Sequence, residues 1–402
     1  MKILLVGNYE RDGQKSMVRY CSMLESLLRS AGQEVSVIRP TPQLGRFGNA
    51  HRGSGKWLGY ADKFVLFRAR LRAAAAATDV VHICDHSNSM YARYLEGIPH
   101  VVTCHDLIAV RQARGEFTGM RTRWTGRRYQ EMIINGLRRA RHVVCDSENT
   151  RADLLRIAGI PAERTSVVYI AMNYPYAPLN HTERIARLED LGIASGERFL
   201  LHVGSGSWYK NQSGVIRIFH HLTRTVQARD MRLVVICNVW QPLLQKMVDD
   251  YRLSGRVSVH FNLEAEDLRA LYSGATALLF PSLCEGFGWP IIEAQACGCP
   301  VFTSNRAPMT EVGGNGAVYI DPEDPVEAAK IIVDSLPHAQ RMREAGFTNN
   351  RRFTSDQMVD GYLNIYASAM DRDSSTNRQF RREARSQDCE GKRGIEANTA
   401  TS

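Results

Sequence analysis

The most informative part of this sequence is the stretch FPSLCEGFGWPIIEA, at residues 280–294. The apolar run that leads into it ends at Phe280 and predicts a buried strand. A helix is expected to begin near Trp289, because the proline beside it is tolerated in a first helical turn. Gly286 and Gly288, in the loop between, let the backbone approach a ligand closely. Since the free amides at a helix start attract anions, this strand-loop-helix unit predicts a phosphate site.

Two carboxylates flank this loop. Glu285 lies at the mouth between strand and helix, and Glu293 lies about one turn into the helix. One can therefore reach a sugar and the other a ribose hydroxyl, with a diphosphate between them. The alternative is a solvated acid in a loop and an unrelated acid on a helix surface, and the intervening Gly-Phe-Gly-Trp-Pro argues against it. We take Glu285, Gly286, Phe287, Gly288 and Glu293 as candidates for binding a ligand that carries a sugar and a diphosphate.

A second constellation is HVGSGSWYKN, at residues 202–211. It reads as a strand, a glycine-rich loop and a lysine, Lys210, at the entry of a helix. An ammonium group there can neutralise a β-phosphate as it becomes the leaving group. The alternative is a surface lysine that merely caps the loop.

Strands and helices alternate along the whole chain. Residues 2–7 (KILLVG) form an apolar run closed by glycine, as in a buried parallel strand, and residues 15–31 carry apolar side chains at helical spacing. After a proline-rich break at 174–178 the pattern restarts with an apolar run at 199–204. This alternation predicts an α/β protein with two Rossmann-like, doubly wound domains that face each other across a cleft. Ligands of such sheets bind outside the carboxyl ends of the strands.

The pattern also predicts domain boundaries. We expect one domain at 1–175 and a second at 176–354. A helix near 355–370 has an apolar face that can pack back on the N-terminal domain. Residues 371–402 are rich in Arg, Ser, Asp, Asn and Thr and nearly free of aliphatic side chains, which predicts a disordered tail.

The second half resembles the retaining glycosyltransferase family 4, whose members have the two-domain GT-B fold. The stretch from Glu285 to Glu293 looks like that family's E-x7-E motif, and the likeness continues through ACGCPV at 296–301, EV at 311–312 and DP at 321–322. A match of this length is far more specific than a lone glycine-rich loop. It implies an enzyme of polysaccharide biosynthesis that moves a mannose- or glucose-type hexose from a nucleotide-diphosphate sugar to a glycan or lipid-linked acceptor. The N-terminal domain at 1–175 would then be the acceptor domain, and the C-terminal domain at 176–354 the nucleotide-sugar donor domain.

The resemblance also implies roles for single residues. Lys210 is similar to the family's phosphate-binding lysine, and His105 resembles the N-domain histidine that lies near the donor sugar. Ser205 stands where the family often carries a diphosphate-binding arginine, and Gly13 is the single match to a glycine pair after the first strand. We therefore expect catalytic roles for His105, Lys210 and Glu285, and further donor contacts at Gly13 and Ser205.

A histidine followed by an acid at a strand end is often structural. Asp106, directly after His105, could orient the imidazole or cap the next turn, and the sequence leaves both readings open.

No metal and no cofactor are expected beyond the nucleotide sugar itself. Family members need no bound divalent ion, the sequence has no Asp-x-Asp motif, and its nine cysteines are scattered without metal-ligand spacing. Scattered thiols favour a reducing cytoplasm. The chain has no run of about eighteen apolar residues that would predict a membrane span, and its first apolar run is too short for a signal-peptide core.

The charge is unevenly distributed. Residues 1–180 carry 26 basic and 15 acidic side chains, and the remainder carries 25 and 27, for a net charge of +9. A basic N-terminal half suggests an anionic acceptor or a membrane surface, whereas no motif supports nucleic acid. Basic residues gather at 63–72 and at 111–128. Peripheral attachment at the inner membrane face and a merely solvated surface both stay open.

Two other functions compete with the transferase. A non-catalytic nucleotide-sugar-binding subunit is suggested by Ser205, which removes one expected cation. An NAD-dependent oxidoreductase would also use Rossmann domains, but the first strand is not followed by the G-x-G-x-x-G fingerprint.

Overall fold

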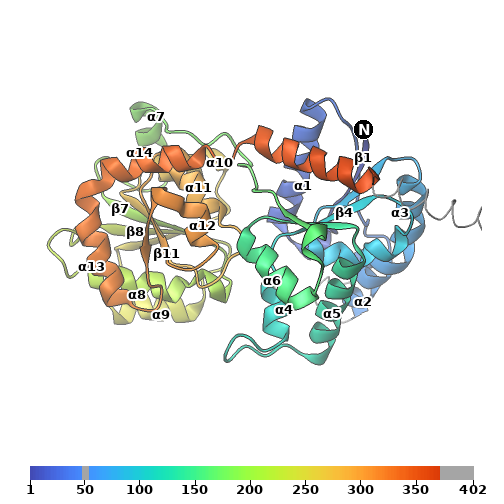
Figure 1. Ribbon diagram of the computed structural model, residues 1–402. Helices are drawn as coiled ribbons and strands as arrows, with labels where there is room; N and C mark the ends of the chain where they lie inside the picture. The colour runs from blue at the N-terminus through green and yellow to red at the C-terminus, as the bar shows by residue number, and fades with distance from the viewer. Residues whose placement is uncertain (48–53, 372–402) are drawn as a thin grey trace, which may run out of the picture.

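The computed structural model describes residues 1–47 and 54–371. It contains two six-stranded, fully parallel sheets, and Figure 1 shows the two halves side by side with helices around each. The strands of the first sheet are β1 (Lys2–Val6), β2 (Glu34–Ile38), β3 (Val80–Ile83), β4 (His100–Cys104), β5 (His142–Cys145) and β6 (Thr165–Val167). Those of the second are β7 (Phe199–Val203), β8 (Arg232–Cys237), β9 (Val257–Phe261), β10 (Ala277–Phe280), β11 (Val301–Ser304) and β12 (Ala317–Ile320).

Helices connect almost every pair of successive strands. In the first half they are α1 (Lys15–Ser30), α2 (Ser54–Ala61), α3 (Phe67–Ala75), α4 (Ile108–Ala113), α5 (Trp124–Arg139) and α6 (Glu148–Ala158). In the second half they are α7 (His181–Asp190), α8 (Gln212–Leu222), α9 (Pro242–Asp250), α10 (Ala265–Gly274), α11 (Trp289–Ala296), α12 (Met309–Gly313), α13 (Pro325–Ser335) and α14 (Ala339–Asn350).

The apolar runs of the sequence form the central strands. In β1, for example, Ile3 to Val6 are completely buried, because helices cover both faces of a parallel sheet and leave no solvated side. Strict alternation of apolar and polar residues is therefore absent from β1, and the strands predicted at 2–7 and 199–204 are confirmed.

The strand order of each sheet indicates where a ligand crevice is expected. The second sheet runs β9-β8-β7-β10-β11-β12, and the first runs β2-β1-β3-β4-β5-β6. The order reverses between β7 and β10 in the second sheet and between β1 and β3 in the first. Ligands of doubly wound sheets bind outside the carboxyl ends of the strands at such switch points. The loop with Lys210 follows β7 and the loop with Glu285 follows β10, so these two segments meet at the second switch point.

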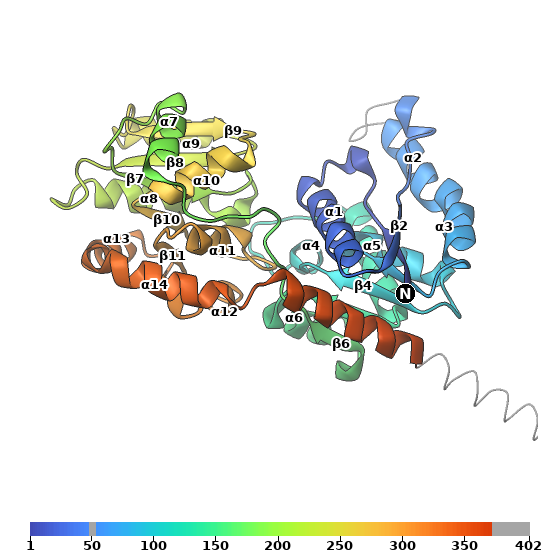
Figure 2. The ribbon, with the colours of Figure 1, turned by 90° about the horizontal axis from the view of Figure 1, so that it is seen from above.

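The chain passes between the halves twice. Residues 168–180, between β6 and α7, carry no helix or strand and include the proline-rich break. After α14 the chain returns, and helix 355–371 lies against the first sheet in both views (Figures 1 and 2). Tyr366 Oη lies 2.7 Å from His82 Nδ1, and Tyr362 Oη lies 3.0 Å from Thr103 Oγ1. The expected tail beyond 371 lies outside the described residues.

Two further features bear on the setting of the protein. Within 1–47 and 54–371, no helix combines the length and the apolar character needed to cross a membrane. The eight cysteines of the same ranges are all free and buried.

Candidate active site

The centre of the site is an ion pair between two loops of the second sheet. Lys210 ends a short 3-10 turn after β7, and its Nζ lies 2.7 and 2.9 Å from the two carboxylate oxygens of Glu285. The side chains are 15% and 7% exposed, and the ammonium also lies 5.1 Å from the centre of the Phe280 ring. A cation so little hydrated interacts strongly with any anion that reaches it. An entering phosphate would compete with Glu285 for Lys210.

Asn211 holds these loops together, and the sequence reasoning missed it. Its Nδ2 donates hydrogen bonds to the carbonyl oxygens of Pro281 (3.0 Å) and Pro322 (3.1 Å), which follow β10 and β12. Its Oδ1 accepts from the amide of Gly214 and so caps α8. The position directly before a helix was the available signal, because asparagine is a favoured N-cap.

Glu293 is buried in α11 at 6% exposure. Its Oε2 accepts a hydrogen bond of 2.9 Å from Tyr272 Oη. Burial raises the pKa of Glu293 to about 7, although the Tyr272 hydrogen bond and the nearby Arg19 and Lys210 cations oppose the rise. This carboxylate can thus change its charge near neutral pH, whereas a surface glutamate would not.

Backbone geometry explains why residues Gly286 and Gly288 of this loop are glycines. A Cβ on Gly286 would lie 2.0 Å from the carbonyl oxygen of His105, so this loop of the second half touches the backbone of the first. The Gly286 carbonyl oxygen accepts from Ser147 Oγ at 2.7 Å. Gly288 has φ +110° directly before α11, a conformation that favours glycine. Phe287 is buried, with its ring centroid 5.6 Å from that of Phe353.

His105 is held from both sides of its ring. Nδ1 lies 2.6 Å from Asp146 Oδ2, and Nε2 lies 2.8 Å from the Cys84 carbonyl oxygen. A carbonyl oxygen only accepts, so Nε2 carries a proton. Burial lowers the pKa of His105, but the carboxylates of Asp146 and Asp85 outweigh it, and the pKa rises to about 9. The imidazole is therefore a cation at neutral pH, and both its nitrogens are engaged within the first half.

The structure decides between the two roles that the sequence leaves open for Asp106. Asp106 Oδ1 accepts from the amide of Ile108 at the start of α4, which is the capping reading. Asp146 orients the imidazole instead. Ser147 caps α6, because its side chain accepts a hydrogen bond from the amide of Thr150.

The last two candidates lie in loops. Ser205 Oγ donates to Ser207 Oγ at 3.0 Å and carries no charge into the site. Gly13 has φ +70° and ends a 3-10 turn over Glu10–Asp12, and a Cβ there would meet no atom within 4 Å. The positive φ of Gly13, and not close contact with other atoms, explains why a glycine occupies this position.

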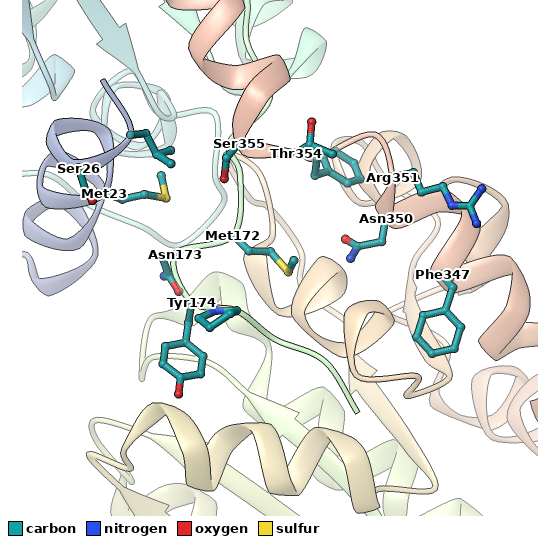
Figure 3. Close-up of a pocket in the computed structure, with 13 residues that line it drawn as sticks. Met23, Ser26, Met172, Asn173, Tyr174, Phe347, Asn350, Arg351, Thr354 and Ser355 are labelled. Carbon is teal, nitrogen blue, oxygen red and sulfur yellow. The ribbon is translucent and has the colours of Figure 1, made fainter. Parts of the chain in front are cut away.

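The candidate residues lie apart from a cavity at the crossing between the two halves. Among the described residues no three His, Cys, Asp or Glu side chains are grouped to hold a metal ion. A cavity of about 610 Å³ lies where α1, residues 172–175 and the end of α14 meet, and Figure 3 shows Met23, Met172 and Phe347 around it. It contains none of the candidate residues.

Two family models match the chain, one in each half. Residues 184–350 match the family model described as "Glycosyl transferases group 1", and residues 17–173 match "Glycosyltransferase Family 4". The chain belongs to the group 1 glycosyltransferases. The first match ends at 173 and the second begins at 184, so the crossing between the halves separates them.

Two curated relatives are bacterial mannosyltransferases. O-antigen chain mannosyltransferase B of Escherichia coli is 28% identical over 244 residues, which is 60% of this chain and 64% of the relative. O-antigen chain mannosyltransferase RfbU of Salmonella typhimurium is 30% identical over 215 residues, 52% of this chain and 56% of the relative. The matched region thus spans less than two thirds of either relative.

Solved structures confirm the GT-B fold. Anabaena Alr3699/HepE in complex with UDP and glucose superposes with a TM-score of 0.72 at 17% identity, covering 92% of this chain and all of that one. WaaG, a glycosyltransferase involved in lipopolysaccharide biosynthesis, gives 0.66 at 16% identity, with 92% and 99% covered. At identities this low, the similarity shows only that the folds are alike.

Proposed function

We propose that this glycosyltransferase transfers a hexose, of mannose or glucose type, from a nucleotide-diphosphate sugar to a glycan or lipid-linked acceptor. The observation that carries the proposal is the Lys210–Glu285 pair at the switch point between β7 and β10. It puts a poorly hydrated cation beside a carboxylate, next to the start of α11. The names of the curated relatives favour mannose.

The groups of the site suit a nucleotide-diphosphate sugar. Lys210 would turn from Glu285 to the β-phosphate, and the freed Glu285 carboxylate would accept hydrogen bonds from hydroxyls of the transferred hexose. Glu293, deeper in α11, would accept from the ribose. Charge-assisted hydrogen bonds of this kind are stronger than neutral ones.

We propose that transfer proceeds with retention of configuration, by attack on the face from which the leaving group departs. The bond between the anomeric carbon and the phosphate oxygen breaks, and its electron pair leaves with the nucleoside diphosphate. The acceptor oxygen forms the new bond, and its proton passes to the departing phosphate. Lys210 stabilises the growing phosphate charge, which is where a fixed cation contributes most to rate.

The reaction would need no metal ion. Lys210 and the first amides of α11 would supply the positive charge that a divalent ion supplies in other transferases. The backbone of His105 lies beside Gly286, in the loop before α11. To hold a sugar hydroxyl, His105 Nε2 would exchange the Cys84 carbonyl for the sugar oxygen.

The rival function is that of a non-catalytic nucleotide-sugar-binding subunit. Ser205, bonded to Ser207, leaves the diphosphate with one cation fewer than the family pattern. The decisive experiment is incubation of the purified protein with labelled nucleotide-diphosphate mannose and glucose and a mixture of neutral glycosides. Release of nucleoside diphosphate with formation of a labelled glycoside supports the transferase. Tight donor binding with neither product would establish the subunit instead.

We further propose that the enzyme is cytoplasmic and attaches peripherally to the inner membrane face. The described cysteines are free thiols, as in a reducing compartment. Trp124 is 68% exposed at the start of α5, with exposed arginines around it. Not every basic residue of the two segments is available, because Lys63 is buried against Asp12 and Arg111 pairs with Glu116 and Asp153.

A further inference from the structure

A second cavity, of about 390 Å³, lies on the first half and faces the second. Its walls come from the segments that follow β1, β3 and β4, from α5, and from Trp208 and Tyr209 of the second half. It therefore lies at the switch point of the first sheet, where a ligand of that sheet is expected. Its volume is in the range of small-molecule sites.

The cavity directly adjoins the donor loop. Asp106, in its wall, lies so close to Gly286 that a Cβ on the glycine would be 3.0 Å from the Asp106 Cβ. Trp208, in the opposite wall, is two residues before Lys210. Its ring packs on Phe117 of the first half with centroids 4.8 Å apart. A molecule in the cavity would thus lie beside the sugar end of the proposed donor site.

The charge of the walls favours an uncharged ligand over an anion. All lining residues belong to the described part of the chain, and none is a lysine or arginine. Asp85 and Asp106 contribute carboxylates. Burial raises the pKa of Asp85, but the neighbouring His86 and His105 outweigh it, so this pKa is lowered and the group is ionised. The positive charge of His105 is already balanced by Asp146.

Several polar groups in the walls have capacity for a ligand. Within the described residues, the side-chain amides of Gln112 and Gln130 and the indole nitrogen of Trp208 make no hydrogen bond, and Asp106 uses only Oδ1. Carboxylates, amides and an aromatic face match a pyranose, which presents hydroxyls at its rim and C–H groups on its face.

We propose that this cavity binds the acceptor as an uncharged pyranose unit. Asp106 accepts hydrogen bonds from its hydroxyls, Gln112 accepts from or donates to them, and Trp208 covers the face of the ring. The inference rests on the proposed transferase function and adds the chemical class of the acceptor. The basic surface of the N-terminal half lies outside the cavity and does not select a phosphorylated sugar there.

The test separates this proposal from the transferase itself. Calorimetry with UDP and GDP first measures nucleotide binding by the full chain. Saturation-transfer NMR on the nucleotide-saturated protein then compares methyl α-mannoside, methyl α-glucoside and methyl α-galactoside with mannose 6-phosphate. We expect saturation of at least one neutral glycoside and none of the phosphate. Gln112→Ala should weaken that glycoside roughly five- to tenfold through a lost hydrogen bond, with unchanged nucleotide affinity.

The control is Gln357→Ala, on the exposed face of helix 355–371, which should change neither affinity. Trp208→Ala should also weaken the glycoside, and Trp208→Phe should restore much of the loss. Preference for mannose 6-phosphate, absence of any neutral binding, or equal affinities of the Gln112 and Gln357 variants would overturn the acceptor assignment while nucleotide binding persists. Failure of both UDP and GDP to bind would instead overturn the donor site and the proposed function.

Discussion

Lys210 and Glu285 hold each other in a two-pronged ion pair, with Nζ 2.7 and 2.9 Å from the carboxylate oxygens. The residue expected to bind phosphate and the residue expected to bind sugar are thus each other's partner. Because the two side chains are in direct contact, their energetic contributions are coupled, and their variants should be studied together.

Lys210→Ala should lower the rate of sugar transfer by at least ~10², because the leaving phosphate loses its cation. It also leaves the Glu285 carboxylate poorly solvated and unpaired, which destabilises the fold. The double variant Lys210→Ala/Glu285→Gln should regain thermal stability but no activity. Near-normal transfer by the single variant would remove Lys210 from the reaction.

Glu293→Ala should weaken binding of the free nucleoside diphosphate, whereas Glu285→Ala should chiefly impair use of the intact sugar donor. The reason is that each carboxylate is assigned to a different part of the donor, Glu293 to the ribose and Glu285 to the hexose. Calorimetry with nucleotide and with donor compares the two. The assignment fails if the Glu285 variant loses more affinity for the free nucleotide than the Glu293 variant does.

The His105–Asp146 pair should make stability depend on pH. The pKa of His105 is about 9 in the folded protein and about 6.5 in an unfolded chain. Its contribution is therefore complete below about pH 6.5 and is lost as the pH rises through about 9. Asp146→Asn should remove this fall in the free energy of unfolding.

The measurement is urea unfolding of the wild type and of Asp146→Asn from pH 6 to 9.5. The difference between their free energies of unfolding at each pH cancels the contributions of other titrating groups. Asp230→Asn, an exchange of an exposed partner of Arg198, is the control and should keep the wild-type slope. Identical slopes for wild type and Asp146→Asn would show that the pair is not ionic.

Transfer should continue at an unchanged rate in excess chelator, since Lys210 and the start of α11 are proposed to replace a divalent ion. The measurement is the initial rate before and after dialysis against EDTA. Activity that is lost on dialysis and regained with magnesium or manganese would contradict the metal-free mechanism.

The exposed arginines near Trp124 should bind anionic membranes. Basic residues near an anionic leaflet contribute about 1 kcal/mol each, and an exposed indole suits the headgroup level. Co-sedimentation with liposomes should rise with anionic lipid and fall with salt. Replacement of Arg121, Arg123, Arg127 and Arg128 by serine should abolish it. Recovery in the supernatant under all conditions would leave these arginines as a solvated surface.

Local patterns of the sequence determined the class of fold and most of the donor loops. Apolar runs closed by glycine predict parallel strands, and their alternation with helices predicts the two doubly wound sheets that the structure contains. The loops with Lys210 and Glu285 could be found in the same way, because each follows a strand and precedes a helix within a few residues. The domain boundaries at 175 and 354 stay predictions.

The partners of these residues were decided only by the tertiary structure. Asp146 reaches His105 because β4 and β5 are neighbours in the sheet, and 41 residues of chain separate the two side chains. Gly286 meets His105 because the two halves pack against each other. Asn211 joins three loops of the second half because the strands before these loops belong to one sheet. Spacing along a chain encodes the period of a helix or strand, whereas contacts between distant segments depend on strand order and on packing of the two halves.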